Sequence, residues 1–118
     1  MTLLISGRKR HNMPKSYSEK FVLNLQKNTS DHIGIKMAKL CVKARLPVKD
    51  VANVFKVSRM AIHSWFRGSE IKEENVIKIH KFNNIIETGL LEGHLPKITS
   101  ILSKHYLEEI VTPEIIEK

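Results

Sequence analysis

The sequence predicts an all-α protein, a compact bundle of about five to six helices. Apolar residues recur at steps of three and four through nearly the whole chain, whereas the alternation typical of strands is scarce and the hairpin dipeptides Asn-Gly and Asp-Gly are absent. The chain has 118 residues, of which 42% are hydrophobic and 27% charged. It is therefore long enough for one domain with a core of its own and too short for two of ordinary size.

The first 15 residues carry basic side chains but no repeating apolar face, so we expect a flexible basic arm over residues 1–15. Its cations cluster at Arg8, Lys9 and Arg10. A basic arm can follow the narrow minor groove of DNA. A solvated tail that contacts nothing is the alternative, and the sequence does not decide between the two.

The next stretch predicts two helices. Ser16 and Glu19 have the spacing of a capping box, and apolar residues follow at steps of four, which predicts a short helix over about 17–27. A second apolar stripe predicts a helix over 33–44. That helix carries the single cysteine, Cys41, between apolar neighbours, so we expect a buried thiol rather than a reactive one.

Residues 46–68 are the most informative part of the chain. They divide into a helix of about eight residues, a turn over 56–58, and a second helix that Ser58 caps and Gly68 closes. Ala52 lies where the two helices would cross, and a small side chain there permits a close approach over so short a turn. This is the spacing of a helix-turn-helix unit.

The stretch resembles the helix-turn-helix of the lambda repressor and Cro family and aligns with it without gaps. The matching positions are Leu46, Val51, Ala52, Phe55, Val57, Ser58, Arg59, Ile62, Trp65 and Gly68. Looser similarity extends over residues 33–82. Lys56 stands where the family usually has glycine, so we expect this lysine in a left-handed conformation. Pro47 and Val48 replace the family's usual cap and the glutamine that follows it.

The resemblance implies that the helix beginning at Ser58 enters the major groove of DNA. The positions that the family uses to touch DNA are here Ser58, Arg59, Met60, His63, Ser64 and Arg67. We assign Arg59 and His63 to base edges, and Met60 to a thymine methyl group. The remaining three are expected at phosphates or the groove wall, where contacts position the protein without specifying sequence.

The positive charge is concentrated toward the start of the chain. The formal net charge of +8 resolves into +8 over residues 1–45, +3 over 46–68 and −3 over 69–118. Such a polarised chain favours an anionic partner that it meets with one face. The cations expected near phosphates, besides those of the arm and the second motif helix, are Lys36, Lys39, Lys43, Arg45, Lys49 and Lys56.

Beyond the motif, apolar residues predict two more helices. The first covers about 70–88 and is ended by Gly89. A loop over 90–95 follows, and Pro96 opens the last helix. One side of this helix is expected to be apolar and buried, with Ile98, Ile101, Leu102, Tyr106 and Ile110. The excess of apolar surface over residues 89–118 favours a homodimer through this C-terminal extension, since two-fold dimers read paired half-sites.

No catalytic, metal or cofactor site is predicted, so we expect no enzyme. His63 and Ser64 diverge by about 100° on a helix, and no third group orients them. The six histidines include no i, i+4 pair. Trp65 and Phe66 are similar to the Trp-Phe pair of homeodomains, but the Asn and Arg expected just after that pair are absent from this sequence.

Nothing in the sequence indicates that the protein binds a small-molecule ligand or lies in a membrane. No apolar run approaches the roughly 20 residues that cross a bilayer, and the apolar start precedes the charges, the reverse of a signal peptide. The expected location is the cytoplasm of a bacterium or of a phage-infected host.

We therefore predict a DNA-binding domain over residues 16–88, between the arm and the C-terminal extension. The expected function is sequence-specific binding of double-stranded DNA, as a small transcriptional regulator of the repressor type from a bacterium or phage. Two alternatives remain open. One is an accessory protein of phage DNA packaging or recombination, and the other is a protein-interaction module that uses the helix-turn-helix only as a scaffold.

Overall fold

The computed structural model describes residues 17–116, and this part of the chain contains helices and no strand. In chain order the elements are α1 (Glu19–Lys27), α2 (Ile33–Ala44), α3 (Val48–Phe55), α4 (Arg59–Phe66), α5 (Glu73–Leu91), α6 (Ser100–Tyr106), the π-helical turn η2 (Leu107–Val111) and α7 (Thr112–Ile116). The predicted all-α class is confirmed. The predicted arm over 1–15 lies outside the described residues.

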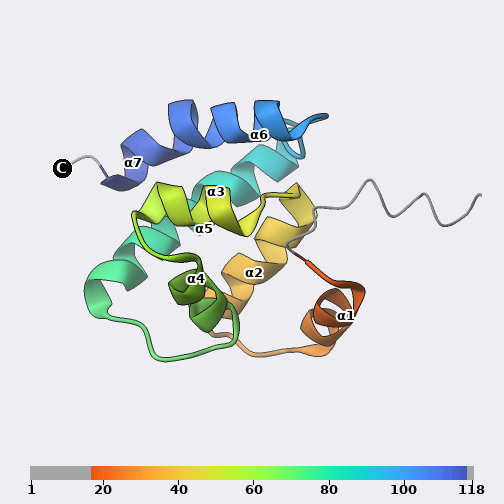
Figure 1. Cartoon of the computed structure of the whole chain (residues 1–118), viewed down its shortest axis with the longest axis vertical. Helices are drawn as coiled ribbons and strands as arrows, with labels where there is room; N and C mark the ends of the chain where they lie inside the picture. The colour runs from red at the N-terminus through yellow and green to blue at the C-terminus, as the bar shows by residue number, and fades with distance from the viewer. Residues whose placement is uncertain (1–16, 117–118) are drawn as a thin grey trace, which may run out of the picture.

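The helices are arranged around one core (Figure 1). The long helix α5 packs along α2, and α6, η2 and α7 follow one another as a single rod that lies across α3 and α5. In Figure 1 this C-terminal rod runs along the top and α4 lies toward the bottom, with α3 between them. No helix in the described part of the chain is long and apolar enough to cross a membrane.

The first helix begins later than the capping box predicted. Ser18, not Ser16, is the N-cap of α1, and its hydroxyl accepts a hydrogen bond from the backbone N–H of Phe21 at 3.1 Å. Tyr17 precedes the helix, where its buried hydroxyl donates to the carbonyl of Leu46. The predicted start was wrong because serines two residues apart compete for the cap, and burial of Tyr17 in the core selects the second.

Helix α2 spans the residues predicted for it. Cys41 is fully buried, which confirms the prediction of a buried thiol, and this burial raises the pKa of the thiol. The helix ends at Arg45, which adopts a left-handed conformation with φ 56° and donates its N–H to the carbonyls of Cys41 and Val42.

Helix α5 does not end at Gly89, as predicted, but continues to Leu91. The left-handed glycine after it is Gly93, with φ +81°. Gly89 is buried inside the helix, where a Cβ would stand 2.8 Å from the hydroxyl of Tyr106 and 3.1 Å from Cδ1 of Leu95. Because Gly89 has no side chain, the C-terminal rod can pack against it, and α5 does not end there. One helix therefore runs through the predicted domain boundary between residues 88 and 89.

The last helix differs from the prediction in both start and face. Pro96 does not open it: α6 begins at Ser100, capped by Thr99, whose hydroxyl accepts from Leu102 N–H at 3.2 Å. The side expected in the core faces solvent, with Ile98 93% and Ile101 72% exposed. Leu102 and Ile110 are also exposed, and Tyr106 is half-buried.

A different set of residues in the rod enters the core. Ser103, Leu107, Val111 and Ile115 are buried, each four residues from the next. In a regular α-helix of 3.6 residues per turn, positions four apart drift around the axis. The wider η2 turn reduces this drift, so Leu107 and Val111 are both buried on the side of the rod that packs on α3.

Candidate nucleic-acid interface

The turn between α3 and α4 adopts the conformation expected from its sequence. Lys56 is left-handed, with φ 60° and ψ 41°, and its N–H reaches the carbonyls of Ala52 and Asn53. Val57 N–H then bonds the Ala52 carbonyl at 3.1 Å. Ser58 caps α4 by accepting from Ala61 N–H at 3.1 Å. The turn thereby ends α3 and starts α4 within three residues, at the cost of one lysine with positive φ.

The inner side of α4 is held by aromatic packing. Trp65 meets Phe55 of α3 edge to face, with ring centroids 5.5 Å apart. Phe66 packs on the other side against Tyr17 and Phe21, each at 6.3 Å between centroids. These contacts tie α4 to both α3 and α1, and they leave its opposite side to solvent.

The first turn of α2 packs against the C-terminal end of α4 and fixes its position. Gly34 lies so close to the end of α4 that a Cβ there would stand 2.2 Å from the carbonyl oxygen of Trp65. His32 adds a hydrogen-bonded link: its Nδ1 accepts from Gly34 N–H, and its Nε2 bonds the Ser69 carbonyl, both at 2.9 Å. Since Nδ1 is the acceptor, Nε2 carries the proton in this arrangement. One imidazole thus caps α2 and holds the segment after α4.

The outer side of α4 presents the residues predicted for DNA contact. Arg59, Met60 and Arg67 are exposed, Met60 by 79%, and so is the cap Ser58. His63 and Ser64 are half-buried. The imidazole of His63 meets Phe66 edge to face at 6.4 Å between centroids, which limits how its ring can turn.

The surface of residues 46–68 carries no exposed carboxylate. The only acidic residue in that stretch is Asp50, and it is buried on the side of α3 that faces the C-terminal rod. The exposed ionised groups are Lys49, Lys56, Arg59 and Arg67. The electrostatic potential that the exposed side chains of α3 and α4 produce is therefore positive.

The other predicted cations divide between free and engaged side chains. Lys43 and Arg45 are exposed at the end of α2, next to the start of α3. Lys36 pairs with Glu87 of α5 at 3.8 Å, and Lys39 donates to the Asn28 carbonyl at 2.6 Å. The last two therefore have partners within the fold.

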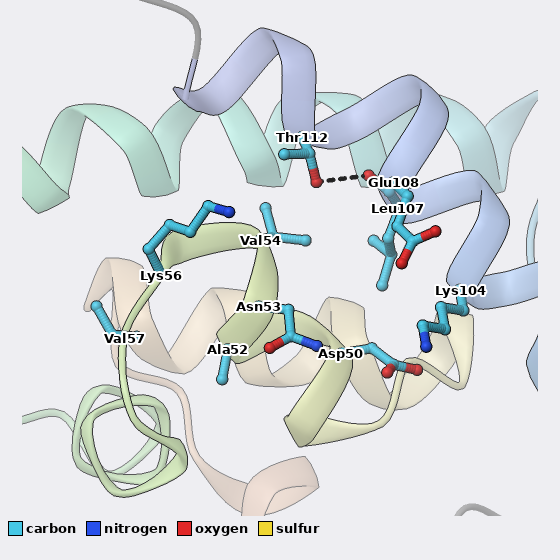
Figure 2. A pocket seen from close by; sticks show the side chains of 10 residues that line it. All are labelled: Asp50, Ala52, Asn53, Val54, Lys56, Val57, Lys104, Leu107, Glu108 and Thr112. Carbon is cyan, nitrogen blue, oxygen red and sulfur yellow. Dashed lines mark hydrogen bonds between the residues drawn. The ribbon is translucent and has the colours of Figure 1, made fainter.

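Two further predictions depend on where the side chains lie. Lys56 extends from the turn toward the C-terminal rod and away from α4, where it lines a hollow between α3 and the rod (Figure 2). Arg8, Lys9 and Arg10 lie outside the described residues. The structure thus leaves the cap and outer side of α4 exposed, leaves Lys43, Arg45 and Lys49 exposed at the end of α2 and the start of α3, and directs Lys56 toward the rod (Figure 2).

Three features of this region were missed from the sequence. Histidine is not a favoured N-cap, so nothing marked His32. Gly34 has no local signal either, because its contact with Trp65 joins residues 31 positions apart. Asp50 gave the one available hint, because it is the lone acidic residue in a basic stretch.

No group of three or more His, Cys, Asp or Glu side chains among residues 17–116 is placed to hold a metal ion. A scan against protein-family models and searches of the curated proteins and of the solved structures find no match for the chain. The functional argument accordingly depends on the geometry and charge of the helices themselves.

Proposed function

We propose that this protein binds duplex DNA sequence-specifically, with α3 and α4 as a helix-turn-helix and α4 in the major groove, and that it acts as a small transcriptional regulator. One observation carries the proposal. The outer side of α4 presents Arg59, His63 and Arg67, and no carboxylate of residues 46–68 is exposed beside them. A major groove admits one α-helix, and its phosphates attract such a surface.

In this proposal some residues of α4 read the base sequence and others position the helix on the DNA backbone. Arg59 reaches the O6 and N7 acceptors of a guanine, a bidentate contact worth about 1–3 kcal/mol of discrimination. His63 reads a neighbouring base edge, and Met60 contacts a thymine methyl. Ser58 and Arg67 contact phosphates, which orient the helix without reading sequence.

Packing supports this role because a reading helix must keep its orientation. The inner side of α4 is held through Trp65 and Phe66, and its end is held through Gly34 and His32. Lys43, Arg45 and Lys49 lie exposed on the neighbouring elements and extend the phosphate contacts. A helix held on several sides carries little conformational freedom into the complex.

We also propose that the regulator is a homodimer joined through the outer side of α6 and η2. Ile98, Ile101, Leu102 and Ile110 are exposed there, an unusual concentration of large apolar side chains for a monomer surface. His105 and Glu109 lie among them, so two copies related by a two-fold axis can pair the imidazole of one with the carboxylate of the other. A second copy supplies a second α4 for a paired half-site.

Selection from a randomised duplex library, followed by affinity measurements over a range of salt concentrations, tests the DNA proposal. We expect an enriched palindrome and a log affinity that falls linearly with log salt. If the chain binds no duplex DNA at any salt concentration, the proposal is wrong and the protein-interaction alternative is favoured. Binding that needs a second protein or a multimeric ring would instead favour the packaging or recombination accessory.

Sedimentation of the purified chain tests the dimer separately. Ile101→Asp should convert the dimer to a monomer, because a carboxylate cannot be buried there without a partner. Ile77→Asp is the matched control, since Ile77 is a 55% exposed isoleucine on α5, away from this surface. Equal sedimentation of the unmodified chain and Ile101→Asp would exclude this interface.

A further inference from the structure

The C-terminal rod is held on α3 along only part of its length. The turn η2 and helix α7 make most of the rod's contacts with α3, and Leu107, Val111 and Ile115 are buried there. Helix α6 buries Ser103 alone. The backbone hydrogen bonds of a helix are internal to it, and Thr112 adds one more by donating its hydroxyl to the Leu107 carbonyl at 2.8 Å. The rod can therefore leave α3 as a unit that keeps its own hydrogen bonds.

The packing between the rod and α3 is incomplete. A hollow of about 590 Å³ lies between α3, with the turn after it, and the facing side of α6, η2 and α7 (Figure 2). Protein interiors are close-packed, so a hollow of this size indicates a loose contact. The segment that joins α5 to the rod contains Gly93, with φ +81°, where a Cβ would meet no atom within 4 Å. This open surrounding leaves the segment free to act as a hinge.

A buried carboxylate lies at this contact. Asp50 is only 6% exposed, and its buried Oδ1 has no hydrogen-bond partner among the described residues. Asp50 faces the rod, from which Lys104 points toward it (Figure 2). Burying an ionised carboxylate without a donor costs far more free energy than burying a protonated carboxyl. The protonation state of Asp50 therefore affects how firmly the rod packs on α3.

Charges of both signs face Asp50, and burial outweighs them. Burial raises the pKa of the Asp50 carboxyl, Lys49 on its own helix and Lys104 on the rod lower it by less, and Glu108 on the rod raises it again. Tyr17, in the segment before α1, also lies near Asp50, and burial raises the pKa of its hydroxyl, so it stays neutral. The closed arrangement of rod and α3 accordingly favours the protonated carboxyl.

We propose that the C-terminal rod is a proton-sensitive strap, which packs on α3 when Asp50 is protonated and opens from α3 more often when Asp50 is ionised. Opening brings the carboxylate into water and removes the cost of its burial. The buried contacts of Leu107, Val111 and Ile115 keep the rod closed most of the time in either form. No DNA contact enters this coupling, so it stands or fails independently of the proposed function.

The direction of the pH dependence follows from the two states of the rod. In the open state Asp50 is in water and has its ordinary pKa of 3.8, whereas burial raises the pKa in the closed state. Above pH 3.8 the closed state therefore binds more protons than the open state. Opening becomes more frequent as the pH rises, until Asp50 is ionised in the closed state as well.

Amide hydrogen exchange of the full chain, followed by NMR between about pH 3.5 and pH 7, tests the proposal. After division by the intrinsic exchange rates, the amides of Leu107 and Val111 should open at least about tenfold more often than those of Met37 and Cys41 in α2, because the rod opens without the rest of the core. Their opening should increase about threefold or more across this range. Equal protection of the rod and α2, or rod opening that does not change with pH, would overturn the proposal.

Two variants with opposite expected effects connect the change to Asp50. Asp50→Asn removes the charge, so opening of its rod should lose most of the pH dependence and be about threefold or more rarer at pH 7 than in the parent. Lys104→Met removes the ammonium group that faces Asp50 and should make opening at pH 7 more frequent.

Glu109→Gln is the matched control, since Glu109 is an exposed carboxylate of the same turn on the outer side of the rod. It should leave both the frequency of opening and its pH dependence unchanged. A pH dependence that persists undiminished in Asp50→Asn would show that another group controls the rod, and the proposal would be wrong.

Discussion

The Cα of Gly34 lies against the backbone of Trp65, at a distance that leaves no room for a side chain. A Cβ at Gly34 would stand 2.2 Å from the Trp65 carbonyl oxygen and 2.8 Å from its carbonyl carbon. Both obstructing atoms belong to backbone, so no rotamer change relieves the overlap. The end of α4 is therefore set by the first turn of α2.

Gly34→Ala should destabilise the protein by about 1–3 kcal/mol, because α2 and α4 must separate to admit the methyl group. Denaturant unfolding measures the loss. Lys36→Ala, two residues along the same helix on its exposed side, serves as the control and should change stability by less than about 0.5 kcal/mol. Equal effects of the two variants would mean that the close approach is not maintained in solution.

Arg59→Ala and His63→Ala should flatten base preference more than they weaken nonspecific binding. Each removes a contact to a base edge, worth about 1–3 kcal/mol for a good bidentate pair, and leaves the phosphate contacts in place. Selection from a randomised library with each variant measures the preference. Lys97→Ala, which removes a cation from the region of the C-terminal rod, is the control. An unchanged preference in both variants would remove α4 as the reading helix.

Deletion of residues 1–12 should weaken DNA binding about equally across sequences. Arg8, Lys9 and Arg10 are lost together, and each phosphate neutralised contributes about 0.9 to the slope of log affinity against log salt. The slope of the truncated chain should accordingly be smaller than that of the full chain. An identical slope would identify the segment as a solvated tail.

Asp50→Asn should alter how stability depends on pH. Burial raises the pKa of the Asp50 carboxyl above its ordinary value of 3.8, so above that pH the native state binds more protons than the unfolded state. Stability from this group then falls as the pH rises through the native pKa. The amide does not titrate, so the variant should gain relative to the parent between pH 3.8 and the raised pKa.

Denaturant unfolding at a series of pH values measures this difference. Asp31→Asn provides an exposed carboxylate as the control, and its gap from the parent should change less over the same range. A gap between Asp50→Asn and the parent that stays constant with pH would contradict the burial of an ionised Asp50.

Local signals predicted the middle of the chain well. Helix α2 has the predicted bounds, Ser58 caps α4, and Lys56 takes the left-handed conformation expected at its position. Each of these features depends on residues within one or two turns of each other, so periodicity, capping and turn chemistry are sufficient. The outer side of α4 follows from the same periodicity once its inner side is buried.

The wrong predictions concern segments whose sequence is compatible with two different local arrangements. The rod offers two apolar sides, one with Ile98 and Ile101 and one with Leu107 and Val111, and the sequence prediction chose the side that is exposed. Packing on α3 and α5, together with the π-helical turn, selects the other side. In the same way Gly89 was read as a helix end, although it serves contact with Tyr106.

The sequence by itself determined the all-helical class, the α3–α4 unit with its turn, and the polarity of charge along the chain. Only the tertiary structure decided which side of the rod is buried, how Gly34 and His32 hold α4, and that Asp50 faces a hollow. The physical reason is the range of the interactions. Helices and caps form from neighbours in sequence, whereas burial is decided between segments that meet only when the chain is folded.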